Sequence, residues 1–148
     1  MSLTDVTLCG KTLCSPVIAA SGTFGFGGEY AGIVDMKKLG GISGKGLTLE
    51  GKYGNEGERL WETPAGLINS IGLQNPGIDV FIERDLAFLK QFDTKIIVNV
   101  CGHAPEEYLA VVERLADEPI DMMEINISCP NVNAGFLAFG QDAHNVEK

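Results

Sequence analysis

Basic residues are scarce in this chain. Lysine and arginine number 11 against 20 aspartates and glutamates, so the 148 residues carry a formal net charge of -9. The sequence contains no cluster of basic residues, and both nucleic acids and anionic membranes are bound through such clusters. These two partner classes are therefore not expected. A small anionic ligand still fits the composition, because one lysine in a cleft can outweigh a distant acidic surface.

Long apolar runs and metal-binding cysteine patterns are also missing. No stretch reaches the length of a membrane span, and no basic segment followed by an apolar run opens the chain, so we expect a cytoplasmic protein. The four cysteines (Cys9, Cys14, Cys101 and Cys129) form no CxxC pair and match no zinc spacing. Cys9 and Cys14 flank a turn at Gly10-Lys11 and could cross-link. In a reducing cytosol we expect free thiols.

What the chain does contain is an alternation of short apolar runs with helical patterns. The expected elements are a hairpin over 3–15, strands at 17–20, 41–45, 95–100 and 122–127, and helices at 30–36, 78–91, 104–118 and 142–148. A long loop, 47–76, follows the second strand. This alternation predicts a parallel α/β fold. About four β/α units fit, whereas an eight-unit barrel needs roughly 250 residues, so a small doubly wound sheet and half a barrel both remain open.

Polar residues fall where the expected strands end. Ser21 follows the first strand, Lys45 ends the second, Asn99 lies near the end of the third, and 126–129 close the fourth. Ligands of parallel α/β folds bind at the carboxyl ends of the strands. Each residue also has a structural interpretation, since Lys45 could be a surface lysine and Asn99 a satisfied core amide. Together the four positions favour a binding site at this rim.

The fourth strand carries two kinds of side chain on opposite faces. Its alternation places Met123, Ile125 and Ile127 on one face and Glu124, Asn126 and Ser128 on the other. If Glu124 points inward, it needs hydrogen-bond donors or a cation, or it keeps its proton. Cys129, before Pro130, is a candidate nucleophile or base, or a small buried hydrophobe. His103 and His144 are assigned no catalytic role.

Several segments resemble the catalytic subunit of class 1 dihydroorotate dehydrogenases. They are Ala20-Ser-Gly-Thr-Phe-Gly, Gly44-Lys-Gly-Leu-Thr-Leu-Glu50, Glu62-Thr-Pro-Ala-Gly, Asn69-Ser-Ile-Gly-Leu-Gln-Asn-Pro-Gly77, Asn99-Val and Asn126-Ile-Ser-Cys-Pro-Asn131. The segment Ala138-Phe-Gly140 and the Gln-Asn-Pro-Gly ending are more similar to the NAD-linked class 1B form than to the fumarate-linked class 1A form. The resemblance covers essentially the whole chain.

This resemblance implies a fold and a site. The fold would be a (β/α)8 TIM barrel, of which residues 1–148 form the N-terminal half of a single FMN-binding domain: about four β/α units after an N-terminal hairpin. Cys129 maps onto the family's catalytic base. FMN contacts map onto Ala20, Ser21, Lys45, Gly46, Asn99 and Asn126. Substrate contacts map onto Lys45, Asn69, Ser70, Ile71, Gly72, Leu73, Asn126 and Asn131. No metal site is implied.

The resemblance also implies an activity and partners. Dihydroorotate would be oxidised to orotate in pyrimidine biosynthesis, by a homodimer working with an electron-transfer subunit that carries FAD and an iron–sulfur cluster. Because the later strands of the family barrel are missing from the 148 residues, we expect this chain alone to be an inactive fragment. The alternatives are a related FMN barrel acting on another dihydropyrimidine and a non-catalytic half-domain.

Overall fold

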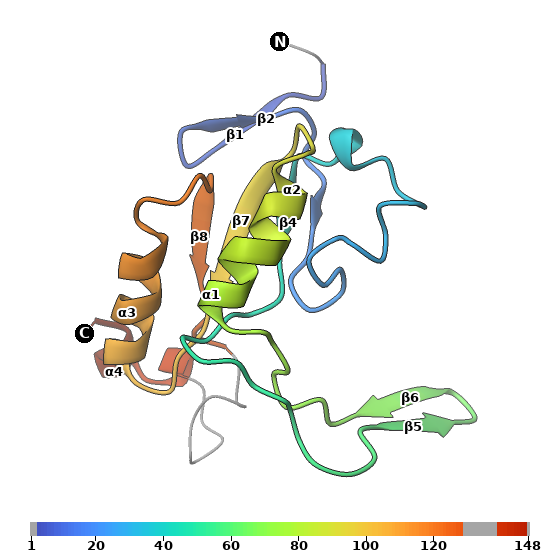
Figure 1. The fold of residues 1–148 in the computed structure, drawn as a ribbon, viewed down its shortest axis with the longest axis vertical. Helices are drawn as coiled ribbons and strands as arrows, with labels where there is room; N and C mark the ends of the chain where they lie inside the picture. The colour runs from blue at the N-terminus through green and yellow to red at the C-terminus, as the bar shows by residue number, and fades with distance from the viewer. Residues whose placement is uncertain (1–2, 129–138, 148) are drawn as a thin grey trace.

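Four parallel strands form the centre of the molecule. The computed structural model describes residues 3–128 and 139–147. Strands β3 (Ile18–Ala19), β4 (Gly41–Ser43), β7 (Lys95–Val100) and β8 (Met122–Ile125) pair in the order β3-β4-β7-β8 (Figure 1). All three pairings are parallel. The expected parallel α/β architecture is therefore confirmed.

Two antiparallel hairpins lie at opposite ends of this sheet (Figure 1). The first, β1 (Val6–Leu8) with β2 (Lys11–Leu13), confirms the expected N-terminal hairpin. Its turn is at Cys9-Gly10, which adopt φ of 48° and 74°, and not at Gly10-Lys11 as expected. The second, β5 (Leu60–Thr63) with β6 (Gly66–Asn69), lies within the segment 47–76, where a loop is expected from the sequence.

The connections after β4 and β7 contain helices, as expected. The first is one continuous helical segment made of α1 (Ile78–Val80), the π-helical η2 (Phe81–Leu86) and α2 (Ala87–Leu89). The second, α3 (Pro105–Leu115), begins at a proline and has two glutamates in its first turn, which favours a helix start. Its buried side includes Val111 and Leu115, whereas the apolar Leu109 is 61% exposed.

The prediction of a helix over 30–36 is wrong. This region consists of turns followed by the 3₁₀-helix η1 (Met36–Lys38), and the chain before it bends at Gly25 and Gly27, both with positive φ. Phe24 stacks on Tyr30 with ring centroids 4.5 Å apart, which stabilises the bend without a helix. Near the C-terminus, the 3₁₀-helix η4 (Phe139–Gln141) and α4 (Ala143–Glu147) confirm the expected last helix.

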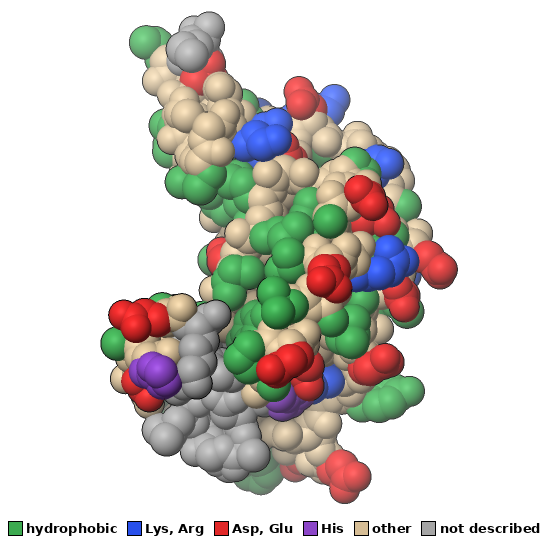
Figure 2. Space-filling model, turned by 90° about the vertical axis from the view of Figure 1, so that its left-hand side faces the viewer, with side chains coloured by type: hydrophobic (Ala, Val, Ile, Leu, Met, Phe, Trp, Pro, Cys, Tyr) green, Lys and Arg blue, Asp and Glu red, His purple; other side chains and the backbone are tan. Residues whose placement is uncertain are grey.

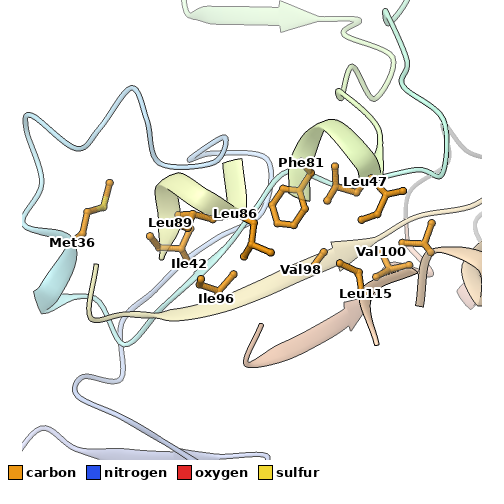
Figure 3. Close-up of a cluster of buried hydrophobic side chains, with 12 residues drawn as sticks. Met36, Ile42, Leu47, Phe81, Leu86, Leu89, Ile96, Val98, Val100 and Leu115 are labelled. Carbon is orange, nitrogen blue, oxygen red and sulfur yellow. The ribbon is translucent and has the colours of Figure 1, made fainter. Parts of the chain in front are cut away.

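The hydrophobic core lies on one face of the sheet, beneath the helices (Figure 3). Ile42, Ile96, Val98 and Val100 point to this face because alternate residues of a strand share a face. They pack against Phe81, Leu86, Leu89, Val111 and Leu115, which are all at most 2% exposed. The described helices next to the sheet thus cover a single face. A doubly wound sheet has helices on both faces, so the partial barrel is the better description.

The sheet does not close within the described residues. Strand β3 forms one edge and β8 the other, so the arrangement is part of a barrel. Near β8, Leu109, Ile125 and Ile127 are exposed, and Figure 2 shows hydrophobic side chains among acidic ones on this side of the molecule. Within residues 3–128 and 139–147, no helix combines the length and the apolarity that a membrane crossing requires.

Candidate active site

Lys45 lies in an irregular segment at the carboxyl end of β4. Ser43 pairs with Ile97, and Leu47 pairs again with Val100, so four steps along one chain match three along the other. The extra residue interrupts the ladder as a β-bulge does, and bulges commonly redirect a side chain next to a site. The Lys45 amide donates to the Gly25 carbonyl at 3.0 Å, which ties this segment to the glycine-rich loop after β3.

Gly46 lies in direct contact with the next strand. A Cβ at this position would be 2.7 Å from Cys101 Sγ and 3.0 Å from Asn99 Oδ1. It would also lie 3.2 Å from Leu73 Cδ1, so the close approach joins β4, the end of β7 and the long loop. Only a residue without a side chain fits here. The structure thereby brings together three of the positions expected in the site: Gly46, Asn99 and Leu73.

The inner face of the sheet, opposite the core, carries a chain of polar side chains. Asn99 of β7 is paired in register with Glu124 of β8, and its Nδ2 donates to Glu124 Oε1. Ser43 Oγ of β4 donates to the other carboxylate oxygen at 3.2 Å. Asn126 Nδ2 donates to Asn99 Oδ1 at 3.1 Å. Glu124 is exposed to solvent on this face, and its carboxylate accepts hydrogen bonds from both of these donors.

The segment Asn69–Leu73 is held by hydrogen bonds within the long loop. Asn55 Nδ2 donates to the Ser70 carbonyl and to Ser70 Oγ, at 3.1 and 2.9 Å, and the Asn55 amide donates to the Ile71 carbonyl at 3.1 Å. Leu73 is buried and adopts φ of 55°, which is uncommon for a non-glycine residue. Such backbone strain persists where the surroundings enforce it, often at binding sites.

Asn75 fixes the base of the same loop. Its Oδ1 accepts from the amides of Thr48 and Gly77, at 3.3 and 3.0 Å, and its Nδ2 donates to the Leu73 carbonyl at 2.9 Å. The Asn75 backbone also pairs with that of Lys52, with N–O distances of 2.8 and 3.0 Å. The buried Asn75 side chain therefore connects the beginning and the end of the long loop that carries Asn69–Leu73.

A cavity of about 380 Å³ opens beside these elements. Its lining residues are Gly22, Lys45, Leu60, Leu67, Asn69, Ile71, Gly72 and Leu73. Leu60, Leu67 and Asn69, which share one face of the β5–β6 hairpin, form one wall, and Lys45 lies on another. A larger cavity of about 740 Å³ shares Lys45 and Ile71 but is otherwise lined by other loop residues and by Arg84. The smaller cavity contains the predicted substrate segment, so we take it as the candidate site.

Not every predicted residue lines this cavity. Asn99 and Asn126 belong to the polar chain described above. Gly46 lies between this chain and the cavity, close to both Asn99 and Leu73. Ala20 and Ser21 follow β3, and the Ala20 carbonyl accepts from Thr23 N and Oγ1 at 3.2 and 2.8 Å. The Ser70 side chain bonds to Asn55 instead. Cys129 and Asn131 lie outside the described residues.

Two features were missed in the sequence. Ser43 is on the inner face and bonds to Glu124; its alternation with the buried Ile42 was the signal that could have revealed it. The second is a trio at the same end of the sheet: Lys52 Nζ lies 2.6 Å from His103 Nε2, and His103 Nδ1 lies 2.9 Å from Glu107 Oε2. His103 and Glu107 are only four residues apart at the start of α3, but Lys52 comes from the long loop, 51 residues before His103, so local sequence could not link it to them.

The charges of this trio act on Glu107. Burial by itself would raise the pKa of its carboxyl, but the hydrogen bonds from the His103 amide and ring, with the charges of His103 and Lys52, lower it overall. The trio joins the base of the long loop to the first turn of α3. Among the described residues, no group of His, Cys, Asp or Glu is arranged to hold a metal ion, and Cys9 and Cys14 are free thiols.

Comparison with known proteins identifies the family. The sequence profile described as dihydroorotate dehydrogenase matches residues 3–147. The chain belongs to the dihydroorotate dehydrogenase family. Among curated proteins of this name, the NAD⁺-linked dihydroorotate dehydrogenase B catalytic subunit of Lachnoclostridium phytofermentans is 58% identical over 139 residues, covering 94% of this chain and 46% of the relative. That of Alkaliphilus metalliredigens is 50% identical over 143 residues, covering 97% and 47%.

A solved structure supports the fold. The dihydroorotate dehydrogenase of Eimeria tenella, crystallised with ferulenol, superposes with a TM-score of 0.69 over 90% of this chain and 38% of its own, at 22% identity. The expected TIM-barrel family is thereby confirmed, here as an unclosed portion with four parallel strands. The chain spans about half the length of the curated dihydroorotate dehydrogenases it matches.

Proposed function

We propose that this chain contributes one half of the active site of an NAD-linked dihydroorotate dehydrogenase, which oxidises dihydroorotate to orotate in pyrimidine biosynthesis. The observation that carries the proposal is the cavity of about 380 Å³ in which Lys45 faces the Asn69–Leu73 segment. Dihydroorotate is a small anion whose ring carries several N–H and C=O groups. A lysine and asparagine amides supply the charge and the paired donors and acceptors that such a ring needs.

The residues at this rim also fit a flavin. The side chains of Asn99 and Asn126 each have a nitrogen that donates and an oxygen that accepts hydrogen bonds, and backbone groups lie beside them. Gly46 lies where a single added Cβ would disturb Asn99 and Cys101. We assign FMN contacts to Ala20, Ser21, Lys45, Gly46, Asn99 and Asn126. A bound FMN would accept the hydride that leaves C6 of the substrate. The FAD and iron–sulfur cluster expected for electron transfer to NAD belong, in this proposal, to a partner subunit.

The chain's own residues have three tasks in this reaction. Lys45 pairs with negative charge on the substrate or cofactor, and its position is set by the bulge that ends β4. Asn69, Ser70, Ile71, Gly72, Leu73, Asn126 and Asn131 orient the substrate ring. Cys129 removes the C5 proton, a task for which a thiol needs only a modest lowering of its pKa from about 8.5.

Partners and location follow as proposals. The proposed assembly is a cytoplasmic homodimer associated with an electron-transfer subunit. The further subunit is supported by the names of two relatives, which are catalytic subunits of an NAD⁺-linked enzyme. Light scattering of the gene product with and without a co-expressed FAD and iron–sulfur subunit tests this. A monomer that never copurifies with such a subunit would contradict it.

The function is tested anaerobically on the full-length gene product loaded with FMN. We expect dihydroorotate to bleach the flavin absorbance, and we expect Cys129→Ser to slow the bleaching by about 100-fold or more, since general-base catalysis contributes factors of this order. Dihydrouracil serves as the competing donor. If dihydrouracil bleaches the flavin and dihydroorotate does not, the substrate is another dihydropyrimidine. No bleaching by either compound, with FMN bound, would contradict both substrate assignments.

A further inference from the structure

Glu124 has no role in the function proposed above, yet it is the acceptor on which the polar chain of the inner face converges. Its two carboxylate oxygens take hydrogen bonds from two different strands, from Ser43 Oγ of β4 and from Asn99 Nδ2 of β7. Asn99 is 2% exposed, so its amide depends on protein partners.

A carboxylate accepts hydrogen bonds and donates none, whereas an asparagine amide has one donor end and one acceptor end. With Glu124 as its neighbour on β8, Asn99 must turn its nitrogen end toward Glu124. Its oxygen end then accepts from Asn126 Nδ2, just after β8, at 3.1 Å and from Cys101 Sγ at 3.5 Å. The orientation of the Asn99 amide therefore decides whether Asn126 meets its oxygen or its nitrogen.

The same logic extends to Asn126. Because Asn99 presents an oxygen, Asn126 must turn its nitrogen inward, and its Oδ1 then accepts from the amide and the hydroxyl of Ser128, at 3.1 and 3.2 Å. Hydrogen bonds thus run in a single direction, from Ser128 to Asn126, then to Asn99, and finally to Glu124. Ser128 immediately precedes Cys129 in the sequence.

We propose that Glu124 is a positioning residue that, through Asn99, sets the orientation of both amides in the FMN site. The inference rests on the proposed function, which assigns Asn99 and Asn126 to the flavin. Planar rings such as flavins are recognised by donors and acceptors in fixed places, so a reversed amide offers the wrong group. An uncharged amide at position 124 can donate as well as accept, so it would no longer force the nitrogen of Asn99 to face it.

The test compares Glu124→Gln with Ser43→Ala in the full-length gene product. Glu124→Gln keeps the size of the side chain but allows the Asn99 amide to reverse. Ser43→Ala removes the other hydrogen bond to the Glu124 carboxylate and leaves Asn99 its acceptor.

We measure FMN affinity by quenching of flavin fluorescence, together with the visible spectrum of the bound flavin and the melting temperature. We expect Glu124→Gln to weaken FMN binding about tenfold, as loss of a charge-assisted hydrogen bond would, and to shift the flavin bands. Ser43→Ala should stay within about twofold of the unsubstituted protein.

A double variant sharpens the test. In Glu124→Gln with Asn99→Asp, the new amide donates to the new carboxylate, which still accepts from Asn126, so the direction at Asn126 is restored. Asn99→Asp alone places two carboxylates side by side. The double variant should therefore bind FMN more tightly than Asn99→Asp alone, and this comparison also decides the question if Glu124→Gln fails to fold.

The outcomes separate this inference from the function on which it rests. Equal FMN affinity and spectra in Glu124→Gln and Ser43→Ala, or a double variant weaker than Asn99→Asp, would overturn the positioning role while the flavin assignment stands. An unsubstituted protein that binds no FMN overturns the proposed function itself.

Discussion

The two faces of the four-stranded sheet are built from alternate residues of the same strands, yet they are stabilised by different forces. On the outer face, Ile96, Val98 and Val100 pack against helices in an apolar core. On the inner face, Asn99 and Glu124 are joined by directional hydrogen bonds. Apolar packing tolerates exchange of one hydrocarbon for another of similar volume, whereas a hydrogen-bonded chain depends on each donor and acceptor. Stability should therefore depend most on the outer face and ligand binding on the inner one.

The largest effect on stability is expected from Phe81→Ala. Phe81 is 2% exposed and its ring lies 5.3 Å from that of Phe26, so truncation leaves a cavity in the core. We expect a loss of about 3–5 kcal/mol in the free energy of unfolding, measured by urea denaturation. The control is Val80→Ala, at a neighbouring position that is 42% exposed. Equal losses for the two variants would mean that the outer face is not the main source of stability.

On the inner face, Asn99→Ala should cost less stability. It removes the donor to Glu124 and the acceptor for Asn126 at once. Leaving such groups without partners costs about 1–3 kcal/mol. The same denaturation experiment measures it. A loss as large as that of Phe81→Ala would show that the polar chain is a principal part of the folding energy.

Gly46→Ala tests the close approach between the two elements of the site. The new Cβ would lie 2.7 Å from Cys101 Sγ, so the neighbours must move. We expect about 1–3 kcal/mol of destabilisation, together with weaker FMN binding by fluorescence quenching. Gly28→Ala is the matched control, because a Cβ at Gly28 meets no atom within 4 Å. Gly46→Ala as harmless as the control would contradict the packing described here.

The smallest effect concerns Glu107, outside both faces. Because its pKa in the folded protein is lowered from the ordinary 4.5, its contribution to stability is present above that pH and is lost as the pH falls through the folded value. The unfolding midpoint in urea should therefore decline less steeply on acidification below about pH 5 in Glu107→Gln than in the unsubstituted protein. Glu106→Gln, one position away, is the control. Parallel pH curves for Glu107→Gln and the unsubstituted protein would show that His103 and Lys52 do not act on Glu107.

The outer face was largely predictable from the sequence, and the inner face only in part. Periodicity located β7 and the helix over 78–91, because burial of one face leaves a regular pattern. Alternation also placed Glu124 and Asn126 on one face. It could not show that Ser43 and Asn99 would donate to Glu124, because the local sequence pattern does not determine the register between strands that are far apart in the chain. The contact of Lys52 with His103 also joins segments far apart in the sequence, so the local pattern could not reveal it.

Errors arose where local propensity was weak. The helix expected over 30–36 gave way to turns, since glycines on its N-terminal side favour bends and Phe24 stacks on Tyr30. The hairpin β5–β6 was read as loop, because its strands are short and expose Leu60, Trp61, Leu67 and Ile68 instead of alternating. The roles assigned to Cys129 and Asn131 remain predictions that rest on resemblance.

The contrast between the faces is tested most directly by FMN titration of Asn99→Ala beside Val98→Ala. The two positions are neighbours on β7 with opposite orientations, and each truncation should cost about 2 kcal/mol of stability. Measured on folded protein at a temperature well below both melting transitions, Asn99→Ala should lose FMN affinity by tenfold or more, on the order expected for a lost polar contact, while Val98→Ala keeps it. Equal loss of affinity in the two variants would contradict the assignment of the flavin to the inner face.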